Sequence, residues 1–492
     1  MTTVDQLIYT RAVTLSQGTN LNDVHDAGFY QGLGLGNAPH GGFWYVEVMR
    51  ATDDASYVTQ RLTELAPANG VSTVYIRTCI GGNWGPLTQQ GAQGPQGPAG
   101  PPGSGGGGGG GSNGFAVYNI LDFGAQPSGD ATAAFQAAFN ALNSNPMGGV
   151  IYIPPGEYVI SSQIGGATDK NFIVRGSGAA SRLIISGGMA NGLVMQQLTP
   201  NNALELCDLR ILATNCPNLG NGSIVSVIGV LQGCDGVRVD NIHFQVTDDA
   251  PCSNVLYICN PSSGVVRDVN IDGYSGWGES NSATGIYIIC DTQGANAIQL
   301  INCNIFRVYT GIRCVGGQIH AYVMEGFEAN ECTIVGCQFG LVMQGGWYRV
   351  PGNGWRGGHI NCRQICIQLD SWMEFKISDA LLYLDGSAAA NSQGFIKATN
   401  CEDINVHNCT TRYVDEITGG PTQRGIWGMA LLNSQNCLIQ GNFFDIGRAD
   451  SAAIYAVPGT GCANVRSAFN TKRGGGAALA GDVRSIGEDI VV

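Results

Sequence analysis

The stretch LELCDLRI, residues 204–211, places apolar residues at alternate positions on either side of one central residue. Apolar positions that are two, then three, then two residues apart describe a strand, a corner of one residue and a second strand. A repeat of strands and corners predicts a solenoid, in which stacked coils share one core. The pattern recurs in VRVDNIHF (237–244), GVVRDVNI (264–271), IQLINCNI (298–305), CTIVGCQF (332–339), FKISDALL (375–382), INVHNCTT (404–411), CLIQGNFF (437–444) and ANVRSAFN (463–470).

The corner position of these copies holds mainly residues that tolerate a left-handed backbone and form local hydrogen bonds, as a sharp bend requires. Its members are Asp208, Asn241, Asp268, Asn302, Gly336, Asp379, Asn408, Gly441 and Ser467. A second column, in which glycine precedes an apolar residue, is interleaved with the first: Gly285–Ile286, Gly311–Ile312, Gly340–Leu341, Gly394–Phe395 and Gly425–Ile426. A β-sandwich has similar alternation but would not keep two interleaved columns in register. We therefore predict an all-β chain whose main body is a parallel β-helix.

The chain contains 17 cysteines, and the repeat assigns several of them to the core. The position after the corner holds aliphatic residues and cysteines in turn: Leu209, Ile242, Val269, Cys303, Cys337, Ala380 and Cys409. A column shared in this way predicts that the thiols face inward as small hydrophobic groups. The odd number of cysteines and the absence of a C-x-x-C pair argue against a zinc site and a simple disulfide framework. We expect neither a bound metal nor another cofactor.

Composition argues against two classes of partner. The formal net charge is −13, and no run of lysine or arginine offers the basic stripe that nucleic acid requires. No apolar stretch is long enough for a transmembrane helix, so no insertion into a membrane is expected. The first residues, MTTVDQLIYT, lack the basic and apolar regions of a secretory signal. We therefore expect the chain to fold in a cytoplasm.

Residues 91–105, GAQGPQGPAGPPGSG, have glycine at every third position, and a run of glycines follows them. This is the collagen pattern, in which three polyproline-like chains wind together because only glycine fits at the crowded axis. A flexible Gly/Pro linker is the alternative. The strict period favours the collagen interpretation, so residues 91–114 are predicted to form the neck of a homotrimer.

Residues 1–90 contain strand-like runs at 43–49 and 72–78, and they resemble a known module. The similarity to the knob domain of pyocin and phage tail-fibre proteins rests on four stretches: GTNLNDVHDAGFYQ (18–31), NAP (37–39), SYVTQRL (56–62) and YIRTCIGGNWGPL (75–87). The resemblance implies a small β-rich module used in fibre attachment or sugar contact.

After the neck, Asp130 is a predicted N-cap for a helix whose apolar face carries Phe135, Ala138, Phe139 and Leu142. GGVIYIPPGEYVI (148–160) then predicts a strand, a turn and a second strand. DFGA (122–125) and the stretch 148–158 resemble the start of the pectate-lyase-like β-helix domains of phage tailspikes. The resemblance implies an entrance cap over residues 115–165, a right-handed parallel β-helix over 166–475 and a C-terminal tail over 476–492.

Three stretches are rich in residues that suit a sugar chain: GYSGWGESNSATG (273–285), HAYVMEGFEANE (320–331) and GGWYRVPGNGWRGGH (345–359). We expect them to bulge from the coils as loops. Aromatic rings can cover the apolar faces of sugars, while charged groups bind hydroxyl or acid groups. The candidate carbohydrate-binding residues are Trp277, Trp347, Tyr348, Arg349, Trp355, Arg356 and Trp372.

Cleavage of a glycoside needs two carboxylates, roughly 5–5.5 Å apart for retention and 6.5–9.5 Å for inversion of configuration. Acids on one face, one or two coils apart, approach these separations because neighbouring coils lie about 4.8 Å apart. The candidate catalytic acids are Glu325, Glu328, Asp370 and Glu374. A lyase, which would combine a base with a cation that holds a uronate, is the alternative chemistry.

Together these features resemble a phage tailspike or tail fibre. The resemblance implies a receptor-binding protein that attaches to a bacterial surface polysaccharide and degrades it. The resemblance implies a place in the virion tail after assembly in the host cytoplasm, and contacts with other phage tail or baseplate proteins. A purely adhesive fibre without catalysis, or a bacterial carbohydrate-active enzyme outside any virion, are the alternatives.

Overall fold

The computed structural model describes residues 12–50, 56–65, 74–89, 116–199, 202–216, 226–232, 236–275, 282–316, 324–345, 352–385, 393–414, 426–446, 452–473, 478–487 and 489–491. The chain divides into two compact units, Met1–Gly110 and Gly111–Val492. The predicted neck, residues 91–114, lies outside the described residues. In the described part of the chain, no helix is both long and apolar enough to cross a membrane.

The first unit is a small, mainly antiparallel sheet. Its strands are β1 (Val13–Thr14), β2 (Gly28–Leu33), β3 (Phe43–Arg50), β4 (Val58–Leu65), β5 (Val74–Ile80), β6 (Asn83–Trp84) and β7 (Thr88–Gln89), and a 3₁₀ turn, η1, spans Leu21–Asp23. Trp44, Val46 and Val48 of β3 point inward into a core of their own. The strand expected at 43–49 is confirmed, and the second is described from Val74 onward.

The second unit opens with a cap made of β8 (Ala116–Asn119), the 3₁₀ turn η2 (Ile120–Phe123), the helix α1 (Thr132–Ser144), β9 (Gly148–Tyr152) and β10 (Gly156–Ile160). The apolar face of α1 is buried, as predicted: Phe135, Ala138, Phe139 and Leu142. The predicted N-cap is wrong by one residue, because Ala131 occupies that position. Asp130 still accepts a hydrogen bond from the Thr132 backbone N–H at 2.9 Å, next to the helix start.

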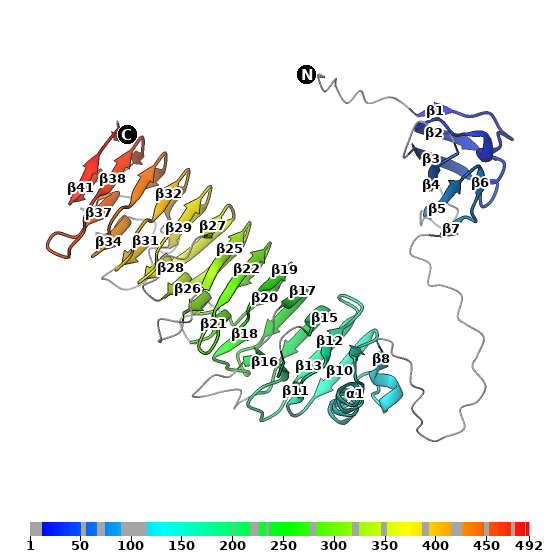
Figure 1. Cartoon of the computed structure of the whole chain (residues 1–492), viewed down its shortest axis with the longest axis horizontal. Helices are drawn as coiled ribbons and strands as arrows, with labels where there is room; N and C mark the ends of the chain where they lie inside the picture. Colours follow the sequence, from blue (N-terminus) through cyan, green and yellow to red (C-terminus); the bar gives the residue numbers. More distant parts are fainter. Residues whose placement is uncertain are drawn as a thin grey trace. The chain divides into compact units, whose positions relative to one another are not determined.

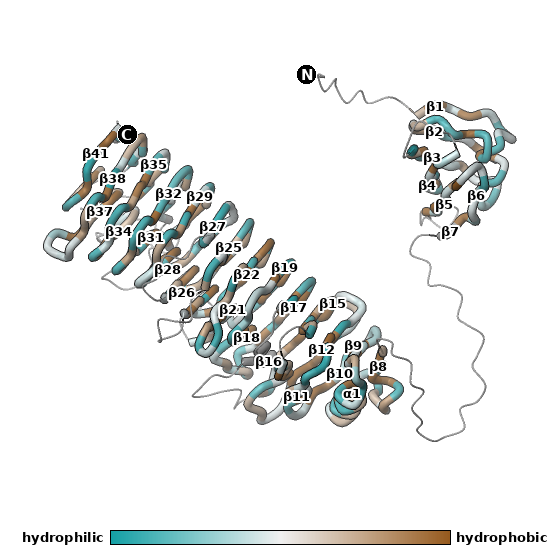
Figure 2. The backbone as a smooth tube through the Cα atoms, viewed as in Figure 1, coloured by the Kyte–Doolittle hydropathy of each residue, from teal (hydrophilic) through white to brown (hydrophobic). Residues whose placement is uncertain are grey.

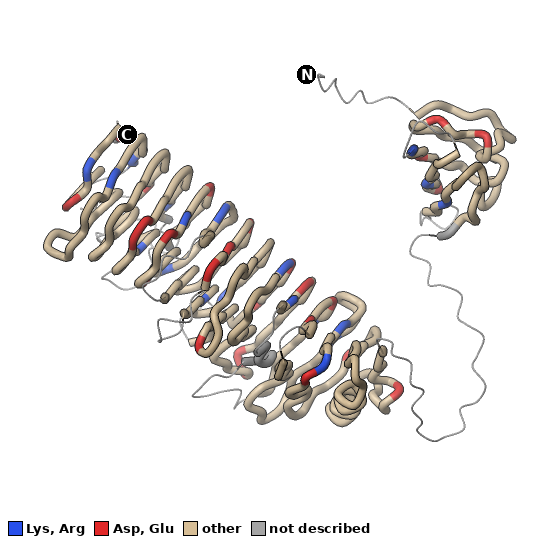
Figure 3. Tube along the Cα trace, viewed as in Figure 1, with Lys and Arg blue, Asp and Glu red and all other residues tan. Residues whose placement is uncertain are grey.

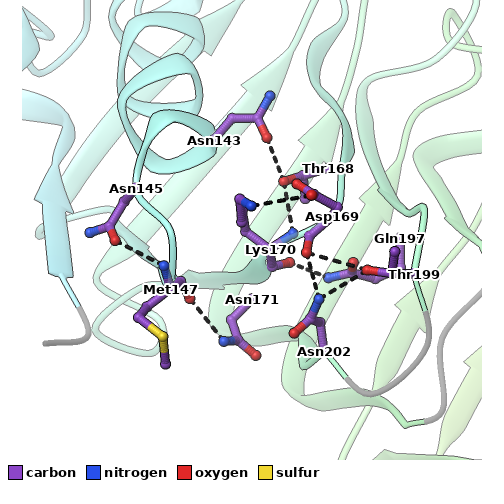
Figure 4. Close-up of polar contacts among 10 residues, drawn as sticks. All are labelled: Asn143, Asn145, Met147, Thr168, Asp169, Lys170, Asn171, Gln197, Thr199 and Asn202. Carbon is purple, nitrogen blue, oxygen red and sulfur yellow. Dashed lines mark hydrogen bonds and ion pairs between the residues drawn. The ribbon is translucent and has the colours of Figure 1, made fainter. Parts of the chain in front are cut away.

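Polar side chains tie the end of α1 to the first turns of the next coils (Figure 4). Thr168 Oγ1 donates to Asn143 Oδ1 at 2.6 Å, and Asn171 Nδ2 donates to the Met147 carbonyl at 2.8 Å. Asn202 Nδ2 continues the series by donating to the Asp169 carbonyl at 2.6 Å. The last two of these bonds satisfy backbone carbonyls of the turns, as buried or partly buried peptide groups require.

Beyond the cap the chain winds into a parallel β-helix with three ladders of strands (Figure 1). Sheet one contains β12 (Asn171–Arg175), the first halves of β15 (Leu204–Ala213) and β17 (Val237–Val246), β19 (Gly264–Arg267), β22 (Ala295–Ile301), β25 (Met324–Asn330), β27 (Asn353–Arg356), β29 (Phe375–Ser378), β32 (Asn405–His407), β35 (Leu438–Gln440), β38 (Val465–Ala468) and β41 (Val483–Ser485).

Sheet two contains β10, β13 (Ser181–Ile185), the second halves of β15 and β17, β20 (Asn270–Asp272), β23 (Asn304–Phe306), the first halves of β26 (Thr333–Gln344) and β28 (His359–Asp370), β30 (Leu381–Asp385), β33 (Thr410–Val414), β36 (Phe443–Asp445), β39 (Thr471–Arg473) and β42 (Ile490–Val491). Sheet three contains β11 (Ile164–Thr168), β14 (Leu193–Gln197), β16 (Ser226–Gln232), β18 (Asn254–Cys259), β21 (Thr284–Ile289), β24 (Thr310–Val315), the second halves of β26 and β28, β31 (Gln393–Thr399), β34 (Ile426–Leu432), β37 (Ile454–Ala456) and β40 (Leu479–Gly481).

The corner between sheets one and two is a column of left-handed residues, as the repeat predicted. Asp208, Asn241, Asp268, Asn302, Asp379, Asn408 and Gly441 all have φ between 51° and 65°. Side chains link neighbouring corners, since Asn302 Nδ2 donates to Asp268 Oδ1 at 2.7 Å. The assignments of Gly336 and Ser467 to this column are wrong: Glu331 and Phe469 hold those corners, with φ of 51° and 55°.

The core fills the space between the three sheets with buried apolar residues. Hydrophobic and hydrophilic residues alternate along the coils (Figure 2). The predicted burial of Cys303, Cys337 and Cys409 is confirmed, with exposed fractions of at most 1%. One assignment in the column after the corner is wrong: Cys332, and not Cys337, follows the corner at Glu331. Burial raises the pKa of Cys409 to about 11 and that of Cys337 to about 12, so both thiols stay protonated at neutral pH.

The C-terminal boundary of the β-helix differs from the expectation. Residues 476–492 were expected to form a tail beyond the solenoid, but β40, β41 and β42 pair with β37, β38 and β39 of the preceding coil. Val483 also packs against the core. This segment therefore adds a further coil.

Candidate functional site

Two tryptophans predicted to stack on sugars are buried, which corrects their assignment. The stretch 352–359 is a coil of the solenoid and not a loop, and Trp355 of β27 occupies the inward column between Ala329 and Ile377. Its ring is 1% exposed, and its Nε1 donates to the Gly357 carbonyl at 2.8 Å. Trp372 is 2% exposed and packs on Gly345. Neither ring offers a face to a ligand.

The remaining predicted residues fall into three groups. Trp277, Trp347, Tyr348 and Arg349 lie outside the described residues. Glu325, near the start of β25, is exposed and pairs in register with Asn296. Asp370 ends β28 on sheet three, where it accepts a hydrogen bond from Ser371 Oγ at 3.1 Å. Neither Glu325 nor Asp370 lines the groove that Glu328, Arg356 and Glu374 share.

Glu328, Arg356 and Glu374 come together in a groove of about 650 Å³ on the outer face of sheet one, where charged residues of both signs gather on β25, β27 and β29 (Figure 3). We call this the sheet-one groove. Four consecutive strands of sheet one, β25, β27, β29 and β32, supply most of its wall. Its lining is Glu328, Asn330, Gly352, Asn353, Gly354, Trp355, Arg356, Glu374, Lys376, Ser378, Asp379, Asp403, Asn405 and His407.

Glycines form the floor of the sheet-one groove. In the outward column of sheet one, Glu328 pairs with Gly354, and Gly354 pairs with Lys376 on the following coil. Because Gly354 has no side chain, the outer face is open at this coil, with Glu328 on the preceding coil and Lys376 on the following one. We call such a position an open rung. A Cβ at Gly354 would come within 2.8 Å of the Lys376 carbonyl, so a larger residue would also disturb the backbone here.

Glu374 and Asp403 stand side by side at one end of this floor. Both have left-handed backbones, with φ of 55° and 58°, and the bridge between Met373 and Glu402 places them at the same level of adjacent coils. Their backbones are therefore about 4.8 Å apart. On the two preceding coils the same corner is occupied by Gly326 and Gly352, with φ of 67° and 80°. The acids thus border an open strip.

The charged side chains of the groove form fewer ion pairs and hydrogen bonds than those upstream on the same face of sheet one. Upstream, Arg238 pairs with Asp240 at 2.7 Å, and Arg267 also binds this carboxylate. The hydrogen bond from Arg267 lowers the pKa of Asp240 below its usual value. Among the described residues, by contrast, the side chains of Glu328, Glu374 and Lys376 form no ion pair or hydrogen bond. They remain available to a ligand.

Neutral polar groups complete the groove. Asn353 Oδ1 accepts a hydrogen bond from the Phe327 N–H at 2.8 Å, which fixes that side chain in the wall. Asn405 Oδ1 is buried and accepts no hydrogen bond from the part of the chain that the structure describes. Carboxylates, cations and amides around a glycine floor can bind hydroxyl-rich chains, and they can also exchange protons with them.

Several residues of the groove escaped the sequence prediction, although a signal for them existed. Lys376 and Asn405 occupy the second position of the copies FKISDALL and INVHNCTT, which is the outward position of the first strand. His407 occupies the next outward position on β32. Comparing these outward positions between copies would have identified the column. In the described part of the chain, no cluster of His, Cys, Asp or Glu could hold a metal ion.

Comparison with known proteins agrees on the fold. The sequence model of the family described as rhamnogalacturonase A/epimerase, pectate lyase-like, matches residues 117–338. No curated protein shows significant sequence similarity to the chain. The matched residues include the cap and the first part of the solenoid, and the match agrees with a right-handed parallel β-solenoid.

Solved structures from two phages resemble the chain. A tailspike protein of E. coli bacteriophage HK620 is 16% identical, with a TM-score of 0.52 over 72% of this chain and 66% of that one. The complex of this tailspike with a pentasaccharide gives a TM-score of 0.50. Gene product 12 of bacteriophage phi29 is 14% identical, with a TM-score of 0.48 over 74% of this chain and 51% of that one. The chain therefore spans about half to two thirds of the length of these phage proteins, and the likeness to the tailspike supports the solenoid fold.

Proposed function

We propose that this protein binds a bacterial surface polysaccharide in the sheet-one groove and hydrolyses it there. The observation that carries the proposal is the pair Glu328 and Glu374, two uncommitted carboxylates on opposite sides of a glycine floor. Glycoside hydrolysis needs two such groups flanking the bond that breaks. One donates a proton to the leaving oxygen, and the other acts on water or on the sugar carbon.

The spacing favours inversion of configuration. Glu328 lies two coils from Glu374, which is about 9.6 Å along the solenoid axis. Glutamate side chains can lean toward the floor, so the carboxyl groups can fall within the roughly 6.5–9.5 Å that leaves room for a water molecule. Asp403, beside Glu374, is the nearest alternative partner. Arg356 and Lys376 supply cations that would bind a negatively charged sugar, which keeps a lyase as the second candidate.

The architecture supports a place in a phage tail. We infer that the first unit is a knob-like attachment module that contacts other tail or baseplate proteins, and that the β-helix carries the receptor-binding surface. The protein would then act in the virion tail after assembly in a host cytoplasm. An adhesive fibre without catalysis would have the same architecture, and so would need the same groove but not its two acids.

A reducing-end assay on purified capsule and lipopolysaccharide from candidate hosts tests the proposed activity. We expect new reducing ends to appear with time. The ultraviolet absorbance of the products identifies the reaction, because a lyase leaves a new C=C bond at each cut and a hydrolase does not. Binding of a polysaccharide without any new ends would show that the protein is an adhesive fibre.

The glycine period at 91–103 leads us to propose a homotrimer. Light scattering should give a mass of about three times the chain mass of 51.5 kDa. Replacing Gly97 by a bulkier residue should loosen the trimer while the β-helix stays folded, because only glycine fits at the axis of a collagen-like neck. A stable monomer at micromolar concentration would rule out the trimer.

A further inference from the structure

We propose a second sugar-binding site on the outer face of sheet three, where the side chain of Trp427 forms a shelf for a single pyranose ring. This inference rests on the proposed function and extends it to a hollow whose described lining contains no carboxylate. The site is a hollow of about 260 Å³. Its lining is Ile365, Gly394, Ile396, Lys397, Trp427, Ala430, Leu432, Tyr455 and Val457.

The shelf is built by two stacked rings on neighbouring coils. The ring centroids of Trp427 and Tyr455 lie 4.3 Å apart and their planes differ by 13°. Both side chains are half-buried on the outer face of the sheet. Tyr455 belongs to the following coil, since it pairs in register with Ala430 of β34. Tyr455 therefore covers one face of the indole and holds the ring in position.

The other face of the indole lies toward the preceding coils, where the side chains are small or recessed. Trp427 pairs in register with Gly394, and Gly394 pairs with Ile365. A Cβ at Gly394 would lie 3.6 Å from Trp427 Cβ and 3.8 Å from Cδ1. The glycine thus leaves open the space that a side chain would otherwise fill against the indole.

The chemistry of the hollow fits a sugar. An indole face is a good surface for the apolar C–H groups of a pyranose, while hydroxyl groups at the ring edge need polar partners. Lys397 supplies such a partner, because it lines the hollow and pairs in register with Ala430, three residues after Trp427. Its ammonium can donate to a hydroxyl or to the carboxylate of an acidic sugar. The described lining contains no carboxylate, so the site would hold a sugar without cleaving it.

A holding site on a different sheet from the sheet-one groove would keep a long polysaccharide near the protein between cleavage events. Linked sites raise the apparent affinity for a multivalent ligand without new contacts in either one. The stacked pair and the open rung on sheet three carry this proposal independently of the acids on sheet one. The sequence alone did not single out either Trp427 or Tyr455.

The test uses the full chain on an array of bacterial surface oligosaccharides, with intrinsic tryptophan fluorescence as a second readout. Trp427→Ala should weaken binding of the oligosaccharides by about tenfold, since it removes the stacking surface. Gly394→Leu should do the same with the indole still present, because the new side chain fills the hollow. Tyr287→Ala removes another half-buried aromatic of sheet three, outside the hollow, and should leave binding unchanged.

Each remaining outcome decides against the proposal. Unchanged binding by both Trp427→Ala and Gly394→Leu, in a protein that still cleaves polysaccharide, would overturn the second site and leave the proposed function intact. A fall in oligomeric mass in Trp427→Ala would show that the shelf is a contact between copies of the chain. Absence of any binding or cleavage by the unmodified protein would remove both the proposed function and this site.

Discussion

Replacing Glu374 by glutamine should lower the rate of polysaccharide cleavage by at least about a hundredfold while binding is retained. The amide keeps the size of the side chain but cannot donate or accept the proton that hydrolysis requires. Glu374 has no ion pair to lose in the described structure, so folding should be unaffected. Reducing-end kinetics on the wild type and the variant, with a pull-down of the same polysaccharide, measure the two effects separately. Glu328→Gln should behave in the same way.

Glu325→Gln is the matched control for this experiment. Glu325 lies on β25, three residues before Glu328, and is also an exposed glutamate, but it does not line the sheet-one groove. It should retain full activity. If Glu328→Gln and Glu374→Gln both cleave at the wild-type rate, the reaction takes place elsewhere on the solenoid.

Trp355→Ala should destabilise the β-helix by about 3–5 kcal/mol, because it removes a large buried ring and leaves a cavity. The indole is 1% exposed between two coils, and its N–H donates to a corner carbonyl that would then lose its partner. The midpoint of unfolding, followed by circular dichroism in denaturant, measures the loss. Arg356→Ala, at the next and exposed position of β27, should change stability by less than about 0.5 kcal/mol. Wild-type stability in Trp355→Ala would show that the ring is not part of the core.

The repeat predicted the fold because most coils share one sequence pattern. Inward residues are apolar, and most corners are Asp, Asn or Gly because those residues tolerate a left-handed backbone. The coil at 353–362 broke the pattern, since its corner is Gly357 and another glycine, not an apolar residue, follows it. The sequence therefore predicts a loop in this stretch. As a result, the sequence predicts Trp355 to be a sugar contact, whereas the structure buries it in the core.

The candidate site was only partly predictable for a related reason. Glu328, Arg356 and Glu374 were found as chemically suitable residues, but their juxtaposition depends on the register between coils whose connections differ in length. The floor of the groove is defined by Gly354, a residue with no side chain to attract attention. Asp403 likewise becomes notable only when the bridge between Met373 and Glu402 sets it beside Glu374.

The alternation of inward and outward residues along sheet one also affects how such a protein can evolve. Exposed outward residues such as Glu328 and Lys376 lie beside buried inward residues such as Ala329 and Ile377. If the proposed function is correct, a mutation on the outer face can therefore alter which glycan is recognised at little cost to folding. Duplication of a whole coil would lengthen the binding surface by one rung and leave every existing rung in register. A solenoid of this kind can therefore change its outer surface by small, independent steps.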